Sequence, residues 1–336
     1  MSASPIVTEA QAHKCDVVAV DIGGTHARFA IATVEDGRVK SLGTPTTLKT
    51  AEYASFQTAW QAFAALNTTP LPRAVAIAFA GPVSGEVLQL TNSHWVVRRA
   101  LIPERLNVDN YIVVNDFGAV GHAVAQAEPG DFIHLCGPEQ AIPDDGVISI
   151  IGPGTGLGVA QLLRDGAAYR VVETEGGHGD FAPLDGFEDG LLSAMRQHTR
   201  RVSVERIVSG PGIRALYEAL ARLESHVIEA PDDKALWTAA LDGSDPLAVA
   251  ALDRFCMTLG SVAGDIALIQ GASAVVIAGG LGARLASHLP HSGFAERFAA
   301  KGRFETMLRD MPVKLITLSE PGLFGAAAAF ARKHTQ

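Results

Sequence analysis

The chain has 336 residues, of which 48% are apolar and 19% charged, with 34 glycines and a formal net charge of −9 at pH 7. This length allows two domains with full cores, and the composition excludes a disordered chain. The acidic balance argues against a nucleic-acid-binding surface, which needs an excess of basic residues. Three widely separated cysteines (Cys15, Cys136 and Cys256) form no metal or disulfide motif and are typical of a reducing compartment.

Two segments bear on location. Residues 1–14 are small and polar and lack the apolar run of a signal peptide. The longest apolar stretch, 247–270, contains Asp253, Arg254 and Asp265, which predicts a buried helix rather than a membrane span. We therefore expect a cytoplasmic protein with no membrane partner.

One pattern occurs twice in the first half of the chain. Each copy is an apolar, β-branched run, a glycine-rich bend and a second apolar run, which predicts a hairpin. The bends contain Gly23-Gly24-Thr25 and Gly154-Thr155-Gly156, with Gly24-Thr25 aligning on Gly154-Thr155. Bare glycines let backbone N–H groups approach a phosphate, and threonine adds a hydroxyl. One bend alone could be an ordinary turn, but two favour a polyphosphate clamp and a nucleotide-dependent phosphotransferase.

The remaining elements follow in chain order, with a domain boundary expected in the Pro- and Gly-containing segment 127–145. Strands are predicted over 39–48, 74–80, 111–114, 274–278 and 313–318. Helices are predicted over 53–65, 116–125, 187–199, 212–222, 247–270 and 322–332. This alternation predicts an α/β protein of two related halves.

Other nucleotide-binding motifs are absent from the sequence. A Rossmann fingerprint starting at Gly152 would need glycine where Leu157 stands, and no GxxxxGK[ST] sequence or protein-kinase motif set occurs.

Two acidic positions follow predicted strands. Asp21 ends the strand before the first bend, where a carboxylate could hold Mg²⁺ through its waters; the plainer alternative is a turn hydrogen bond. Asn115-Asp116 stands where a strand meets a helix, at the sheet edge where ligands of open α/β folds bind. Asp116 could accept a hydroxyl proton during phosphoryl transfer, or simply cap the helix.

The segment Glu175-Gly176-Gly177-His178 places a carboxylate and an imidazole three residues apart. Such groups can bind adjacent hydroxyls of a polyol through charge-assisted hydrogen bonds. Half of a metal site is the alternative, but no second ligand cluster with metal spacing lies nearby in the sequence.

Five motifs together carry a family resemblance. They are Gly23-Gly24-Thr25, Asn115-Asp116-Phe117, Gly154-Thr155-Gly156-Leu157-Gly158, Glu175-Gly176-Gly177-His178 and Ser209-Gly210-Pro211-Gly212. In this order the chain resembles the ATP-dependent bacterial glucokinases of the hexokinase/actin-like ATPase superfamily, from about residue 17 to the C-terminus.

The resemblance implies two actin-like (ribonuclease H-like) α/β domains around a central cleft. The small domain would contain residues 1–126 and be completed by a C-terminal helix at 320–336, and the large domain would contain residues 127–319. The implied activity is phosphorylation of glucose by ATP with Mg²⁺ for glycolysis, by a homodimer that binds neither nucleic acid nor membrane.

The resemblance also implies roles for single residues. Asp116 would be the general base on the glucose 6-hydroxyl. The other sugar-binding residues would be Asn92, Asn115, Glu175, His178 and Glu205. Phosphate would be held by Asp21, Gly23, Gly24, Thr25, Gly154, Thr155 and Gly156, with Asp21 also holding Mg²⁺ through water. Gly279 and Gly280 would lie beside the adenosine.

The sequence departs from the family's pattern at two places, and two alternative functions are considered beside glucose phosphorylation. His26 stands where many members have asparagine, so no contact is assigned to it. Residues 181–198 contain no cysteine, so the structural zinc of the related repressor–kinase family is not expected. A kinase for another hexose, such as fructose or mannose, would carry the same motifs. A non-catalytic sugar sensor is the other alternative, although such regulators carry a helix-turn-helix ahead of the first hairpin.

Overall fold

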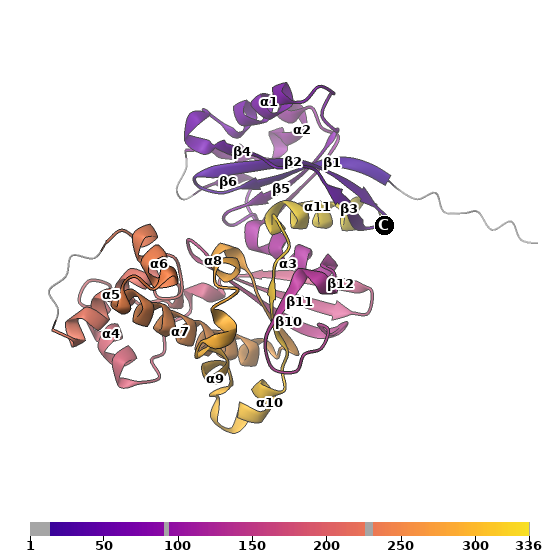
Figure 1. Ribbon diagram of the computed structural model, residues 1–336. Helices are drawn as coiled ribbons and strands as arrows, with labels where there is room; N and C mark the ends of the chain where they lie inside the picture. Colours follow the sequence, from indigo (N-terminus) through magenta and orange to yellow (C-terminus); the bar gives the residue numbers. More distant parts are fainter. Residues whose placement is uncertain (1–13, 91–93, 226–230, 336) are drawn as a thin grey trace, which may run out of the picture. The chain divides into compact units, whose positions relative to one another are not determined.

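The computed structural model describes residues 14–90, 94–225 and 231–335 (Figure 1). The chain divides into two compact units. Unit 1 consists of Met1–Gln126 and Glu320–Gln336, and unit 2 consists of Ala127–Ser319. A six-stranded sheet forms the centre of each unit.

The sheet of unit 1 has the strand order β3-β2-β1-β5-β8, with β4 also paired to β2. The first three strands are antiparallel, whereas β5 and β8 run parallel to β1. The bounds are β1 (Lys14–Ile22), β2 (His26–Glu35), β3 (Arg38–Leu42), β4 (Thr46–Lys49), β5 (Ala74–Phe79) and β8 (Asn110–Asn115). A separate two-stranded sheet pairs β6 (Val87–Gln89) with β7 (Val96–Arg98).

The two faces of this sheet differ in side-chain size. Along β5, alanines alternate with Val75, Ile77 and Phe79, so one face is small and the other large. The large face packs with aromatic residues of α1 (Phe56–Leu66) and with α2 (Ile102–Leu106). The alanine face packs with α3 (Asp116–Gln126) and α11 (Pro321–His334), seen in yellow beside β1 and β3 in Figure 1.

Small residues let α3 and α11 approach closely. A Cβ atom built on Gly325 of α11 would lie 1.7 Å from the carbonyl oxygen of Ala119 on α3, a distance that no side chain tolerates. The helix that follows unit 2 in sequence is therefore an integral part of unit 1.

The sheet of unit 2 has the order β12-β11-β10-β13-β14-β9. The strands β10, β11 and β12 are antiparallel, β13 and β14 run parallel to β10, and β9 is antiparallel to β14. The bounds are β9 (Phe132–Cys136), β10 (Asp145–Pro153), β11 (Leu157–Asp165), β12 (Ala168–Thr174), β13 (Ala274–Ile277) and β14 (Val313–Ile316).

One long helix forms the centre of the unit 2 core. The helices of this unit are α4 (Gly186–Arg196), α5 (Gly212–Leu223), α6 (Asp233–Asp242), α7 (Pro246–Gln270), α8 (Gly279–Arg284), α9 (Phe294–Ala299) and α10 (Glu305–Arg309). By length and composition α7 could cross a membrane, the one such helix among the described residues. However, 67% of its apolar window is buried against the unit 2 core, as expected for a core helix.

Both units repeat one topology: three antiparallel strands followed by two that run parallel to the first. The expectation of two related α/β halves, each containing one of the two hairpins, is therefore confirmed. The bends differ in length, because the last paired residues are Ile22 with Ala27 in one and Pro153 with Leu157 in the other. The alignment of Gly24-Thr25 with Gly154-Thr155 holds only when counted back from the second strand; His26 then aligns with Gly156, and Gly23 is the extra residue of the first bend.

Several predicted elements change at their ends. The single strand expected over 39–48 is two strands, β3 and β4, because Gly43 and Pro45 interrupt the ladder. The helix expected from residue 53 begins at Phe56, where Ser55 and Thr58 form a capping box. The short elements β6, β7, β9, β12, α2, α6 and α8–α10 were not predicted.

Candidate active site

The first glycine bend is held in shape by a residue from a later segment. Thr50 donates its backbone N–H to the carbonyl of Thr25 at 3.0 Å and its hydroxyl to the carbonyl of Gly24 at 2.7 Å. Within the bend, the Gly23 N–H donates to the carbonyl of His26 at 2.9 Å. The Thr25 side chain is exposed at the tip, where it is accessible to a ligand. No local sequence pattern marks Thr50 for this role, and its side chain is 2% exposed.

Asp21, at the end of β1, forms an ion pair that the sequence did not reveal. Its Oδ2 accepts a hydrogen bond from Arg28 Nη1 at 3.2 Å, and Arg28 also pairs with Glu320 at 3.6 Å. Burial raises the pKa of Asp21 above its usual value, and the charge of Arg28 partly opposes this. A Cβ on Gly322 of α11 would lie 2.8 Å from Asp21 Oδ2, so α11 also shapes this carboxylate.

The donor chemistry at Asp21 fits a magnesium ion that arrives with a nucleotide. Mg²⁺ prefers oxygen ligands and is commonly bound by one or two carboxylates, water and substrate phosphates. Among the described residues, no group of three or more His, Cys, Asp or Glu side chains is placed to bind a metal. A single carboxylate beside the first glycine bend could supply one ligand to Mg²⁺ and would leave the remaining positions to water and to phosphate oxygens.

Asn115 caps the helix that Asp116 begins. The Asn115 Oδ1 accepts from the N–H groups of Phe117 and Gly118 at 2.9 and 3.1 Å, and its Nδ2 donates to the Gly81 carbonyl at 3.1 Å. Asp116 also accepts from the Phe117 N–H at 2.9 Å, through Oδ1. Asn115 therefore caps the first turn of α3. Helix capping, the alternative role considered for Asp116, does not by itself explain an aspartate at this position.

The second glycine bend is held at both of its ends. Its internal bond runs from the Gly154 N–H to the Gly156 carbonyl at 2.8 Å. The Gly210 N–H donates to the Gly154 carbonyl at 2.7 Å, and the Leu157 N–H donates to Glu205 Oε2 at 2.9 Å. The Thr155 side chain is exposed, as Thr25 is in the first bend.

Gly279 lies against the strand that leads into this bend. It has φ +77°, and a Cβ there would lie 2.6 Å from the Pro153 carbonyl oxygen, so this position requires glycine. A Cβ on the next residue, Gly280, would meet nothing within 4 Å. The pair therefore leaves open backbone beside the end of β10.

Three of the predicted sugar-binding residues come together in unit 2. His178 Nε2 lies 3.8 Å from Glu175 Oε2, and His178 Nδ1 lies 3.9 Å from Glu205 Oε1. Arg201 donates to the His178 carbonyl at 2.6 Å and pairs with Asp180, which holds the loop after the motif. Two carboxylates around one imidazole provide acceptors and a donor at a spacing suited to adjacent hydroxyls.

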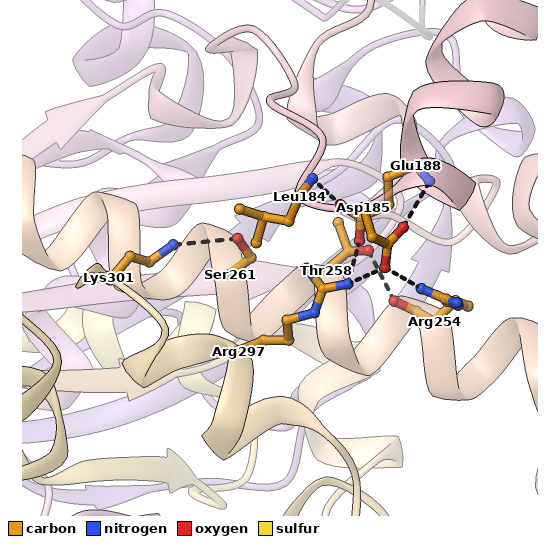
Figure 2. A network of polar contacts seen from close by, with 8 residues as sticks. All are labelled: Leu184, Asp185, Glu188, Arg254, Thr258, Ser261, Arg297 and Lys301. Carbon is orange, nitrogen blue, oxygen red and sulfur yellow. Dashed lines mark hydrogen bonds and ion pairs between the residues drawn. The ribbon is translucent and has the colours of Figure 1, made fainter.

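A largely buried polar network fixes the helix that follows this loop (Figure 2). Asp185 caps α4 through the Glu188 N–H at 2.9 Å and accepts from Arg254 and Arg297 at 2.6 and 2.5 Å. Glu188 accepts from the Leu184 N–H at 2.7 Å. Burial opposes ionisation of Asp185, but the Glu188 amide and the two guanidinium groups hold its pKa below the usual value. The network therefore anchors α4 to α7 and α9.

The predicted site residues fall into one set in each unit. Unit 1 contains Asp21, Gly23, Gly24, Thr25, Asn115 and Asp116, and unit 2 contains Gly154, Thr155, Gly156, Glu175, His178, Glu205, Gly279 and Gly280. Asn92 lies outside the described residues. Thr50, Arg28 and Arg201 were missed because nothing in their local sequence marks the long-range bonds that they make.

Comparisons with known proteins agree along nearly the whole chain. A family model described as Glucokinase matches residues 18–333. A glucokinase from Zymomonas mobilis subsp. mobilis is 60% identical over 321 residues, which is 96% of this chain and 99% of the relative.

Solved structures agree as well. The crystal structure of a glucokinase from an Antarctic psychrotroph has a TM-score of 0.82 at 32% identity and covers 94% of this chain and 98% of that one. A ROK family glucokinase from Streptomyces griseus, solved with glucose and AMPPNP, has a TM-score of 0.62 at 23% identity over 95% of this chain and 100% of that chain. The fold class expected from the sequence, that of the actin-like (ribonuclease H-like) sugar kinases, is confirmed.

Proposed function

Because the chain belongs to the glucokinase family, we propose that it transfers the γ-phosphoryl group of ATP to the 6-hydroxyl of glucose, forming glucose 6-phosphate and ADP. The observation that carries this proposal is the cluster of Glu175, His178 and Glu205, in a chain that also has two glycine bends. The complex of the Streptomyces griseus kinase with glucose and AMPPNP supports the choice of both substrates.

Asp116 is assigned as the general base. As the 6-hydroxyl oxygen forms its bond to the γ-phosphorus, the bond from that phosphorus to the β,γ-bridging oxygen breaks and ADP leaves. The hydroxyl proton passes to the Asp116 carboxylate. Asn115 bonds to the first turn of α3, so it orients the backbone that carries Asp116 besides its assigned place among the sugar ligands.

The remaining roles follow from chemistry. Glu175, His178 and Glu205 bind glucose hydroxyls, and Asn92 is assigned to the same sugar. The exposed Thr25 and Thr155 hydroxyls and the N–H groups of Gly24 and Gly156 contact phosphate oxygens. Gly23 and Gly154 close the two bends through their own N–H groups, and they leave room for the phosphates because they lack a Cβ atom. Gly279 and Gly280 leave room for adenosine. Asp21 holds Mg²⁺ through water, and the ion supplies charge neutralisation at the phosphates.

Two expectations about the protein in the cell belong to this proposal. Family resemblance supports a homodimer, which light scattering on the purified protein tests. Membership of the glucokinase family supports a cytoplasmic location without a membrane partner, and the acidic charge argues against a nucleic-acid partner.

The decisive experiment assays a panel of hexoses with ATP and Mg²⁺, wild type beside Asp116→Ala. We expect glucose to be the preferred acceptor, and we expect the variant to lose about 10²- to 10⁴-fold in kcat, the usual contribution of a general base. Calorimetry should show that the variant still binds glucose. Preferred phosphorylation of fructose or mannose would show that another hexose is the substrate. Turnover by the variant close to that of wild type would reject Asp116 as the general base.

A further inference from the structure

Glu205 lies between the second glycine bend and the cluster proposed to bind sugar. One carboxylate oxygen, Oε2, accepts the Leu157 N–H at 2.9 Å, directly after the bend. The other, Oε1, lies 3.9 Å from His178 Nδ1. A single side chain thus contacts both groups of residues, and it is partly exposed, at 31%.

The second glycine bend lies directly against this carboxylate. A Cβ atom on Gly156 would lie 2.5 Å from Glu205 Oε2 and 3.2 Å from Cδ. By contrast, a Cβ on Gly154, at the other end of the bend, would meet nothing within 4 Å. A side chain at 156 would therefore have to displace the Glu205 carboxylate, whereas one at 154 would not. The value of φ at neither position lies in the left-handed region, so the difference between the two glycines comes from Glu205.

The backbone around Glu205 makes the same connection. The Val204 N–H donates to the Gly179 carbonyl at 2.9 Å, which fastens the Glu205 segment to the residue after His178. Further along the same segment, Gly210 donates to the Gly154 carbonyl at 2.7 Å. A Cβ on Gly177 would lie 2.1 Å from the Leu157 carbonyl oxygen, so the His178 loop also packs directly on the residue after the bend.

We infer that Glu205, besides its proposed contact with sugar, is a positioning residue that fixes the phosphate-binding bend, so that the sugar and phosphate sites of unit 2 depend on one carboxylate. The inference rests on the proposed function. Its physical basis is that the two oxygens have separate partners: Oε2 satisfies a backbone N–H of the nearly buried Leu157, and Oε1 faces the imidazole. A substitution in the bend should therefore change the affinity for glucose. Loss of the carboxylate should in turn change the KM for ATP.

The first test measures glucose binding by calorimetry without nucleotide. Gly156→Ala should weaken glucose binding by about tenfold or more, the equivalent of one charge-assisted hydrogen bond, because the added methyl displaces the Glu205 carboxylate. The matched control Gly154→Ala, whose methyl enters open space, should leave glucose binding within about twofold of wild type. Equal glucose affinities in these two variants would overturn the inference.

The second test compares KM values and does not depend on Gly156. Glu205→Ala should raise KM for both glucose and ATP, because it removes both contacts. Glu205→Gln should raise KM for glucose but keep KM for ATP near wild type, because its amide oxygen still accepts the Leu157 N–H. Glu175→Ala removes the carboxylate that faces His178 Nε2 rather than the bend, and it should raise KM for glucose alone.

The failure of each idea has its own signature. If wild type neither binds nor phosphorylates glucose, the proposed function fails and this inference falls with it. If wild type phosphorylates glucose but Glu205→Ala and Glu175→Ala give the same KM for ATP, only the inference is rejected. Circular dichroism spectra that match wild type show that each variant is folded.

Discussion

His122 lies partly buried on α3, the helix that begins with Asp116. Burial, together with the positive charge of Arg332 on α11, lowers the pKa of His122 from 6.5 to about 4. The folded protein therefore resists protonation of this imidazole, while the unfolded chain accepts a proton at its ordinary pKa. One side chain thereby makes the stability of unit 1 depend on pH.

We expect this dependence between pH 6.5 and about 4. Above that interval both states carry a neutral His122, so its contribution to stability is fully present; as pH falls, only the unfolded chain takes the proton and stability declines. Urea unfolding of wild type and His122→Gln at several pH values measures this, and the variant should lose less stability on acidification. His198 is exposed, so His198→Gln serves as the control, and its loss of stability on acidification should equal that of wild type. Identical slopes for all three proteins would contradict the assignment.

At the scale of elements, the contact between α3 and α11 is the tightest in unit 1. A Cβ on Gly325 would lie 1.7 Å from the Ala119 carbonyl oxygen and 2.4 Å from its carbon, both backbone atoms that cannot move by a rotamer change. The two helices also cover the alanine face of the sheet, so separating them would open that whole face. The spacing between α3 and α11 therefore depends on Gly325 having a hydrogen atom where any other residue has a Cβ atom.

Gly325→Ala should lower the stability of unit 1 by about 3 kcal/mol, the upper range for overpacking a tight interior. Fluorescence-monitored urea unfolding in a Trp237→Phe background reports on unit 1, because the remaining tryptophans are Trp60 and Trp95. Gly190→Ala on α4 is the control, because a Cβ there meets nothing within 4 Å, and it should leave unit 1 unchanged. A stability equal to wild type in Gly325→Ala would show that the helices can separate at little cost.

The same scale shows what the sequence could and could not predict. The hairpins, the strand over 74–80 and the helices over 116–125 and 247–270 were predictable, because their apolar periodicity is strong and local. The split between β3 and β4 depends on Gly43 and Pro45, which the prediction of a single strand over 39–48 did not take into account. At the site, motif residues were found by type and order, but the bonds of Thr50 and Glu205 join segments distant in sequence, which no local pattern records.

At the scale of the whole molecule, unit 2 is continuous in sequence, whereas unit 1 needs two separated segments. The second segment supplies Leu323 and Phe330, both buried, to the alanine face of the unit 1 sheet. Unit 2 has its own core and its own sheet. The two units should therefore differ in how they depend on residues 320–336.

Deleting residues 320–336 tests this dependence. We expect amide hydrogen exchange, measured by mass spectrometry, to show lost protection in β1, β2 and β5 and retained protection in β10, β11 and β13. The physical reason is that the deletion uncovers one face of the first sheet and removes nothing from the second. The control is the full-length protein with the single substitution Gly190→Ala, which should keep its protection against exchange in both sheets. Retained protection in β1 after the deletion would mean that α11 is dispensable for unit 1.

The placement of α11 also affects how the chain is made. A ribosome synthesises the first 126 residues early, yet the helix that covers their alanine face emerges only after unit 2. At ~5–20 residues per second, the wait lasts roughly 10 to 40 s. During that time unit 2 can fold as soon as it leaves the exit tunnel, while the earlier sheet presents an uncovered apolar surface to chaperones and to neighbouring nascent chains. The part of the protein translated first is thus the part completed last.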